Sequence, residues 1–195
     1  RQAYGFLAAL LLIGFVILIQ MNISVILLGI LSLPFVVLYP FTKRFTWWPQ
    51  FFLGLTFNFG ALMGWAAITG DLAAPPLFLY AAGIFWTLGY DTIYAHMDRA
   101  DDEKVGVLST ARLLGEHTAP AVAVFYTICT VLIGCALYMA VPGWRVIPAL
   151  IIIAAGFAWQ VLKIDIHRPH ACLWLFRWNR EMGFLILGAI ALCVI

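Results

Sequence analysis

The sequence predicts an all-α fold, a polytopic bundle of transmembrane helices. Hydrophobic residues make up 65% of the 195 residues and charged residues only 10%, whereas a soluble domain carries roughly 25% charged residues. Apolar runs of about 20 residues recur along the chain, and each is long enough to cross about 30 Å of hydrocarbon as a helix. The sequence lacks the short alternating strands of a membrane barrel. We therefore expect one transmembrane domain over residues 1–195, surrounded by membrane lipid and with no nucleic-acid partner.

Seven apolar segments are expected to span the membrane. In order, they cover residues 4–20, 25–41, 51–68, 77–95, 119–141, 146–162 and 182–195. The loop at 42–50 contains two bases and two tryptophans, which is typical of a membrane interface. Pro75 and Pro76 suit the beginning of the fourth span. A polar loop over residues 163–181 is expected before the last span.

The distribution of Lys and Arg predicts the orientation, because short loops that carry these residues stay on the cytoplasmic or matrix side. With alternating crossings, the N-terminus and the loops at 42–50, 96–118 and 163–181 share one face. The bases on that face are Arg1, Lys43, Arg44, Arg99, Lys104, Arg112, Lys163, Arg168, Arg177 and Arg180. The opposite face has only Arg145 as a base and Asp71 as an acid. Mixed bases and carboxylates on one face suggest a site for an anion and its metal.

The segment from Gly89 to Gly115 holds more than half of the acidic residues. Five of the nine acids lie there: Asp91, Asp98, Asp101, Asp102 and Glu103. If the fourth helix continues past Tyr90, positions 91, 94, 98 and 102 fall near one helical face. Carboxylates at that spacing repel one another unless a cation lies between them. Mg²⁺ is the expected cation, because it prefers oxygen ligands from one or two carboxylates together with phosphates.

Some polar residues leave two interpretations open. Asp91 argues against a merely solvated acidic loop, because a charge inside an apolar helix costs about 2.5–3.5 kcal/mol. Asn58, in the middle of a span, either bonds across helices or contacts substrate. Lys43 and Arg44 either bind an anionic ligand or set the topology. Ser109 and Thr110 are expected to cap a helix rather than to bind phosphate.

Four segments of the sequence resemble the UbiA family of intramembrane prenyltransferases. Residues 90–102, YDTIYAHMDRADD, resemble its second aspartate-rich motif, and residues 104–115, KVGVLSTARLLG, are similar to the continuation of that motif. Residues 39–54, YPFTKRFTWWPQFFLG, resemble the 4-hydroxybenzoate branch, and residues 1–12 resemble the beginning of that branch's third helix. The resemblance covers essentially the whole chain and implies a nine-helix fold, of which the seven spans would be the third to the ninth.

The sequence departs from the family pattern in two places. The first motif of the family, NDxxDxxxD, precedes the third helix and does not occur here. We expect it in a part of the protein that precedes Arg1. Leu108 replaces a lysine that the family often has before Ser109 and Thr110, which places more weight on Lys104 and Arg112 as contacts for a diphosphate.

The resemblance implies an enzyme that uses Mg²⁺ to transfer a polyprenyl group from polyprenyl diphosphate to the ring of 4-hydroxybenzoate, in ubiquinone synthesis. The implied catalytic residues are Asp91, Asp98 and Asp102, and the implied metal ligands are these three and Asp101. The implied substrate-binding residues are Lys43, Arg44, Asn58, Tyr90, Tyr94, Lys104 and Arg112. The acidic loop would face the cytoplasm or the matrix of a bacterial or mitochondrial inner membrane.

Two alternatives to this activity stay open, and the sequence argues against a third. Other branches of the family prenylate naphthoate, haem, chlorophyllide or homogentisate and share the metal chemistry. A CDP-alcohol phosphotransferase would show a DGxxAR sequence, which is not found. A transporter would carry charged residues near the bilayer midplane in several spans, whereas the acids here lie toward one membrane face.

Overall fold

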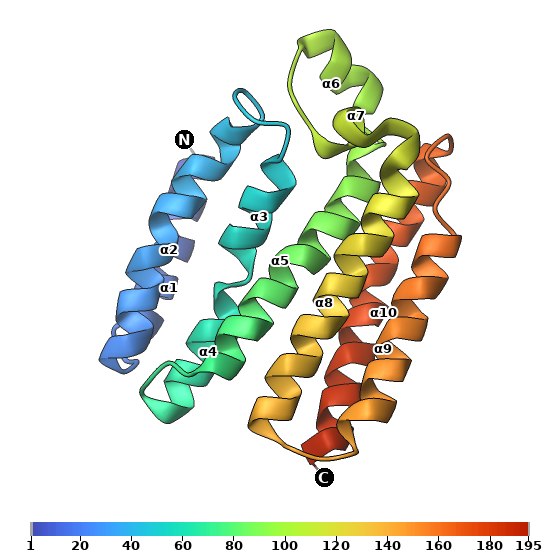
Figure 1. Ribbon diagram of the computed structural model, residues 1–195. Coiled ribbons are helices and arrows are strands. Elements are labelled where there is room, and N and C mark those ends of the chain that lie inside the picture. Colours follow the sequence, from blue (N-terminus) through green and yellow to red (C-terminus); the bar gives the residue numbers. More distant parts are fainter. Residues whose placement is uncertain (1, 195) are drawn as a thin grey trace.

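The computed structural model describes residues 2–194 as an all-helical bundle, which confirms the predicted fold class (Figure 1). Seven long helical rods run up and down the bundle. They are α1 (Gln2–Leu18), α2 (Ile23–Thr42), the consecutive pair α3 (Pro49–Phe57) and α4 (Phe59–Thr69), α5 (Ala74–Ala95), α8 (Thr118–Ala140), α9 (Val146–Leu162) and α10 (Pro169–Val194). The short helices α6 (Arg99–Val105), α7 (Thr110–Leu114) and η1 (Gly115–His117) cover one end.

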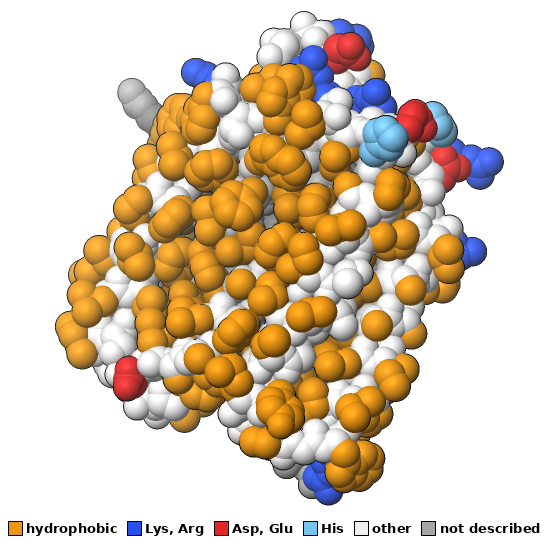
Figure 2. Space-filling model, in the orientation of Figure 1, with side chains coloured by type: hydrophobic (Ala, Val, Ile, Leu, Met, Phe, Trp, Pro, Cys, Tyr) orange, Lys and Arg blue, Asp and Glu red, His pale blue; other side chains and the backbone are white. Residues whose placement is uncertain are grey.

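Several helices have the length and polarity of membrane spans. Among the described residues, the segments Ile23–Thr42, Pro49–Thr69 and Thr110–Ala140 are long and apolar enough to cross a bilayer, and α1 and α9 are shorter apolar helices. No side chain of α1 is buried. The face shown in Figure 2 is largely hydrophobic, and most of its charged side chains gather at the end that carries α6 and α7. Such a surface suits lipid rather than water.

Helix α5 is the central element of the bundle. It contacts α3 and α4 on one side, α8 and α10 on the other, and α7 at its C-terminal end. Gly89 allows the close approach of α8, because a Cβ at that position would lie 2.3 Å from Cε1 of Tyr126. Gly54 of α3 similarly faces the backbone of Ile84, 3.0 Å from a Cβ built on the glycine. The C-terminal end of α5 is thus held by helices on several sides.

Two hydrophobic clusters hold the rods together. The larger one is formed by α5, α8, α9 and α10, and its fully buried side chains include Ile93, Tyr126, Ile153, Leu175 and Met182. The smaller one joins α2 and α4 and is extended by Tyr80 of α5.

Two predicted spans differ from the structure. The third span is not one helix, because α3 ends at Phe57 and α4 begins at Phe59. Asn58 between them has φ −93° and ψ 3°, and its Nδ2 donates to Gly54 O. The last span begins at Pro169, a favourable first helical residue, rather than at residue 182.

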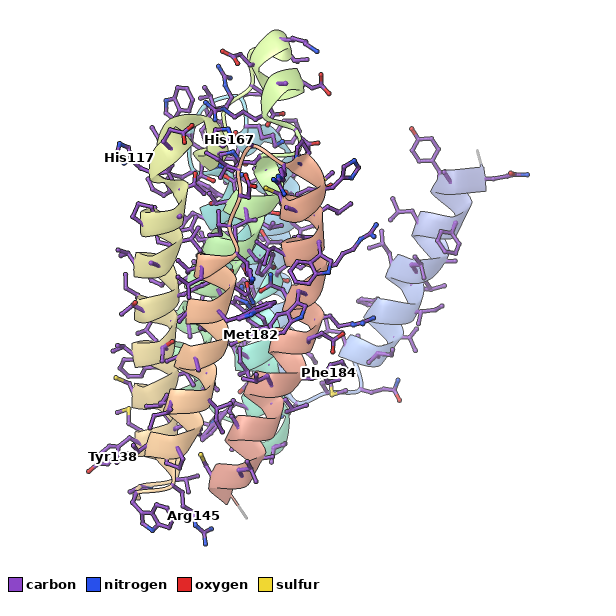
Figure 3. The ribbon with its side chains drawn as sticks, turned by 90° about the vertical axis from the view of Figure 1, so that its right-hand side faces the viewer. His117, Tyr138, Arg145, His167, Met182 and Phe184 are labelled. Atoms are coloured by element: carbon purple, nitrogen blue, oxygen red, sulfur yellow. The ribbon has the colours of Figure 1, made fainter. Side chains whose placement is uncertain are left out.

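The predicted polar loop at 163–181 was therefore wrong. Only residues 163–168 connect the helices, and Arg177, Arg180 and Glu181 lie within α10. The predicted difference in charge between the two ends of the bundle is smaller, because Arg177 and Arg180 belong to α10. Arg145 lies at the opposite end from His117 and His167 (Figure 3).

Candidate active site

The acidic segment folds as a helix end, a turn and a second helix. Helix α5 ends at Ala95, where the amides of His96 and Met97 bond to the carbonyls of Ile93 and Tyr94 in a tightened last turn. Helix α6 begins at Arg99 and ends at Val105, and the next residue, Gly106, has a φ of 77° that favours glycine. The predicted single face for positions 91, 94, 98 and 102 was therefore wrong, because the turn separates the first two positions from the last two.

A salt bridge joins this segment to the loop after α2. Lys43 Nζ lies 3.4 Å from both carboxylate oxygens of Asp102. The Asp102 side chain is only 11% exposed, whereas that of Lys43 is 39% exposed. The amide of Leu108 donates to the carbonyl of Lys43 at 2.8 Å. Residues that are 59 positions apart in the sequence thus form one cationic and anionic corner.

Asp91 and Asp98 flank this corner at different depths. Asp91 is half-buried in the last turns of α5, where Lys43 and Asp98 act electrostatically on its carboxyl group. Asp98 is exposed at the N-terminal end of α6, and its side chain does not cap that helix. Among the described residues, neither carboxylate is in a salt bridge. Both oxygens of Asp98 are therefore free to meet a ligand.

Tyr39 belongs to the same corner, although the sequence interpretation missed it. It lies on α2, one helical turn before Lys43, and Asp91 and Tyr90 are its ionisable neighbours on α5. The spacing of four residues between Tyr39 and Lys43 is the signal that could have found it, since such residues share a helical face.

Lys104 and Arg112, two of the predicted substrate-binding residues, contact protein groups close to them in the sequence. Lys104 pairs with Asp101 at 3.0 Å, and both side chains are at least three-quarters exposed. Arg112 Nη1 donates to the carbonyls of Val107 and Asp102. The Arg112 guanidinium also lies over the ring of Trp47, 5.6 Å from its centroid. Arg112 thereby ties α7 to the loop before it.

Buried hydroxyl and amide groups hold α7 against α3 and α5. The hydroxyls of Thr92 and Thr110 lie 2.7 Å apart, and the amide of Thr110 donates to Gln50 Oε1 at 3.2 Å. All three residues are buried. Ser109 Oγ accepts from the amide of Arg112, as expected for a residue that caps a helix. The end of the bundle is therefore braced by satisfied polar contacts.

A cavity of about 440 Å³ opens beside the upper half of α5. Its lining includes Asn58, Thr87 and Tyr90 on one side and Phe176 on the other. Asn58 Nδ2 and the Tyr90 hydroxyl both donate to Thr87 Oγ1, at 3.0 and 3.3 Å. A second cavity of about 200 Å³ shares Asn58 with the first and has apolar walls. A cavity with polar groups among mainly apolar and aromatic walls therefore lies beside an apolar cavity.

The remaining predicted residues lie around these features. The ring of Tyr94 packs on that of Phe176, with centroids 4.5 Å apart. Arg44 is exposed, and its guanidinium lies 5.9 Å from the centroid of the Phe41 ring.

The donor set of the corner fits Mg²⁺ better than a softer metal. Among the described residues, no three His, Cys, Asp or Glu side chains converge as a ready-made metal cage. A cation that keeps waters and takes one or two carboxylates plus phosphate oxygens does not need such a cage. Asp91 and Asp98 supply uncommitted carboxylates, and Asp102 is held by a single lysine at a long distance.

The sequence matches a known family over nearly its whole length. The model of the UbiA prenyltransferase family matches residues 1–187. The chain belongs to the UbiA prenyltransferase family. This UbiA chain is 43% identical over 191 residues to 4-hydroxybenzoate polyprenyltransferase, mitochondrial, of Caenorhabditis elegans, which covers 97% of the chain and 54% of the relative. It is 40% identical over 195 residues to the human protein of the same name, and this match covers 98% of the chain and 52% of the human protein.

Solved structures show the same fold. The apo structure of a UbiA homologue from Aeropyrum pernix K1 superposes on the whole UbiA chain and on 73% of its own chain, with a TM-score of 0.80 at 23% identity. At that identity the likeness shows the fold alone. The UbiA chain spans about half the length of the curated relatives it matches.

Proposed function

We propose that the protein transfers a polyprenyl group from polyprenyl diphosphate to the ring of 4-hydroxybenzoate, with Mg²⁺ as cofactor. The observation that carries this proposal is the corner of Lys43 and Asp102, which Asp91 and Asp98 flank. A cavity with polar and aromatic walls lies beside it. Membership of a prenyltransferase family and the names of relatives about 40% identical support the same reaction. Residues 1–195 form one domain of this enzyme in the proposal.

The proposed metal ligands are Asp91, Asp98 and Asp102, with Asp101 beside them. Mg²⁺ held there supplies Lewis-acid stabilisation of the departing diphosphate. Lys43 is close enough to neutralise further charge on a phosphate, and its long contact with Asp102 is easily exchanged for a shorter one. Lys104, Arg112 and Arg44 are the other predicted contacts for anionic groups.

The reaction replaces one bond of the allylic carbon by another. The bond to the diphosphate oxygen breaks, and the ring carbon beside the phenol forms a new bond to the allylic carbon while a ring proton leaves. Water must be excluded from the allylic cation. The apolar cavity lined by Leu79, Ala82 and Ile133 offers such a dry surface for the beginning of the prenyl chain, and Asn58, Tyr90 and Tyr94 lie where the acceptor ring would meet it.

Prenyl transfer is tested with the natural full-length protein, radiolabelled 4-hydroxybenzoate and a polyprenyl diphosphate. We expect transfer with Mg²⁺, none with EDTA, and a loss of at least 100-fold for Asp98→Asn. Glu103→Gln is the matched control, because Glu103 is an exposed acid on the same short helix. Transfer that persists in EDTA, or equal rates for the two variants, would contradict the metal role.

The acceptor separates this proposal from its main rival. The same assay with a naphthoate or homogentisate acceptor distinguishes the branches of the family, and a preference for one of these acceptors would replace 4-hydroxybenzoate. Localisation in an inner membrane, with α6 and α7 on the matrix or cytoplasmic side, is the remaining part of the proposal. Protease accessibility of Lys104 in sealed vesicles tests that orientation, because Lys104 is exposed on α6.

A further inference from the structure

Two arginines of α10 lie deeper in the bundle than the sequence interpretation placed them. Arg177 and Arg180 follow Pro169 by roughly 12 and 16 Å along the helix axis, at about 1.5 Å per residue. With 26 residues, or about 39 Å at about 1.5 Å per residue, α10 is longer than the roughly 30 Å hydrocarbon core of a bilayer. Met182, two residues after Arg180, lies about halfway along the bundle (Figure 3). A charge at this depth costs about 2.5–3.5 kcal/mol if it faces lipid.

These arginines instead line the cavity beside α5. Both are exposed and form one wall of the 440 Å³ cavity, opposite Asn58 and Tyr90. Arg180 donates to Glu181 through Nε and Nη2. Among the described residues, no carboxylate lies within salt-bridge distance of Arg177. The wall therefore carries one net positive charge, and Arg177 is the cation without an acidic partner.

The remaining walls are suited to an aromatic ring. Trp86, Tyr90 and Phe176 line the cavity, with edge-to-face contacts between Tyr90 and each of the other two. Asn179 fixes the Trp86 ring, because Asn179 Oδ1 accepts from Trp86 Nε1 at 2.8 Å. A ligand with a flat aromatic ring and a carboxylate at one end suits this cavity. Its ring would pack on the aromatic walls, and its carboxylate would meet the unpaired arginine.

We propose that Arg177 binds the carboxylate of an aromatic acid acceptor in this cavity, with Arg180 beside it as a second donor. The inference rests on the proposed prenyl transfer and assigns the acceptor's acid group to α10. The charge distinguishes this ligand from the diphosphate, because one net positive charge matches a carboxylate. The diphosphate, with several negative charges, matches Lys43 and the metal-binding acids at the end of α5.

The test compares 4-hydroxybenzoate with its methyl ester in the natural full-length protein and in Arg177→Gln. Loss of a charge-assisted hydrogen bond should raise KM for the acid about tenfold or more. KM for the ester and for the polyprenyl diphosphate should change less than twofold. Arg177→Lys should recover part of the preference for the acid. Arg168→Gln is the control, because Arg168 precedes the same helix and pairs with Asp165 in solvent.

Each contrary result has a separate meaning. If the wild type transfers no prenyl group to the acid, the proposed function fails. If it does so and Arg177→Gln keeps the wild-type ratio of acid to ester, the inference alone fails. Reconstitution in phosphatidylcholine vesicles with and without phosphatidylglycerol tests a lipid phosphate as the ligand. An effect of Arg177→Gln that requires the anionic lipid and leaves the ratio unchanged overturns the proposal.

Discussion

Replacing Gly83 by alanine is expected to disrupt the packing of α5 against the break between α3 and α4. A Cβ at Gly83 would lie 2.1 Å from Oδ1, 2.5 Å from Cγ and 3.0 Å from Cβ of Asn58. The shortest of these distances is more than 1 Å below ordinary van der Waals contact, which begins at 3.4 Å. The Asn58 side chain must therefore move, and its hydrogen bonds to Gly54 O and Thr87 Oγ1 are lost.

The expected change in the free energy of unfolding combines two destabilising contributions and one stabilising contribution. Overpacking costs about 1–3 kcal/mol, and loss of the part-buried bond to Thr87 costs about 1 kcal/mol. The better helix propensity of alanine offsets about 1 kcal/mol. The net loss of stability is about 2 kcal/mol. For a chain of this size, that corresponds to a fall in Tm of roughly 4–8 °C.

Thermal unfolding of the detergent-solubilised natural protein, followed by tryptophan fluorescence, measures this change. Gly60→Ala is the matched control, because a Cβ at Gly60 meets nothing within 4 Å; its Tm should stay unchanged or rise. The double variant Gly83→Ala with Asn58→Ala should regain most of the Tm lost by Gly83→Ala alone, because the two closest contacts disappear. A Tm for Gly83→Ala at or above that of the wild type would refute the reasoning.

Two further changes test the interior and the loop end of the bundle. Asn179→Ala should lower the free energy of unfolding by about 2–4 kcal/mol, because Trp86 Nε1 and Gln160 Nε2 lose their acceptor; a loss below 0.5 kcal/mol in denaturant titrations would contradict this. Burial lowers the pKa of His96 to about 4, so its contribution to stability is complete above pH 6.5 and decreases as the pH falls toward 4. His96→Gln should show a flatter dependence of Tm on pH in this window, and an unchanged slope would exclude His96 as the cause.

The fold was predictable because its main signals are local. Lipid requires internally satisfied backbone groups, so each long apolar run specifies a helix. The end of the chain was harder, because α10 carries Arg177, Arg180 and Glu181 on a face that meets a cavity. When only hydropathy is considered, these charged residues predict a loop instead of a helix. The break at Asn58 could not be predicted from the local sequence either. The Asn58 side chain packs against Gly83, which lies 25 positions later in the sequence.

The candidate site was predictable in composition but not in geometry. The cluster of acids could be found from spacing alone, and the importance of Lys43 from the resemblance. That Lys43 contacts Asp102 depends on the fold, because the two residues come from loops that only the packing of α2, α3 and α5 brings together. The turn at 96–98 likewise has no strong breaker such as proline, so nothing in the spacing placed Asp98 outside the helix of Asp91.

Polar groups in the bundle fall into two kinds, those with protein partners and those without one among the described residues. Tyr126, Gln160 and Asn179 satisfy one another between α8, α9 and α10, as expected where an unpaired group costs about 1–3 kcal/mol. Asp98 and Arg177 have no such partner among the described residues, although each lies beside a cavity or a charged corner. The proposed roles of Asp98 in metal binding and of Arg177 in carboxylate binding place the two ligands at different depths of the bundle, because Asp98 follows the end of α5 and Arg177 lies within α10.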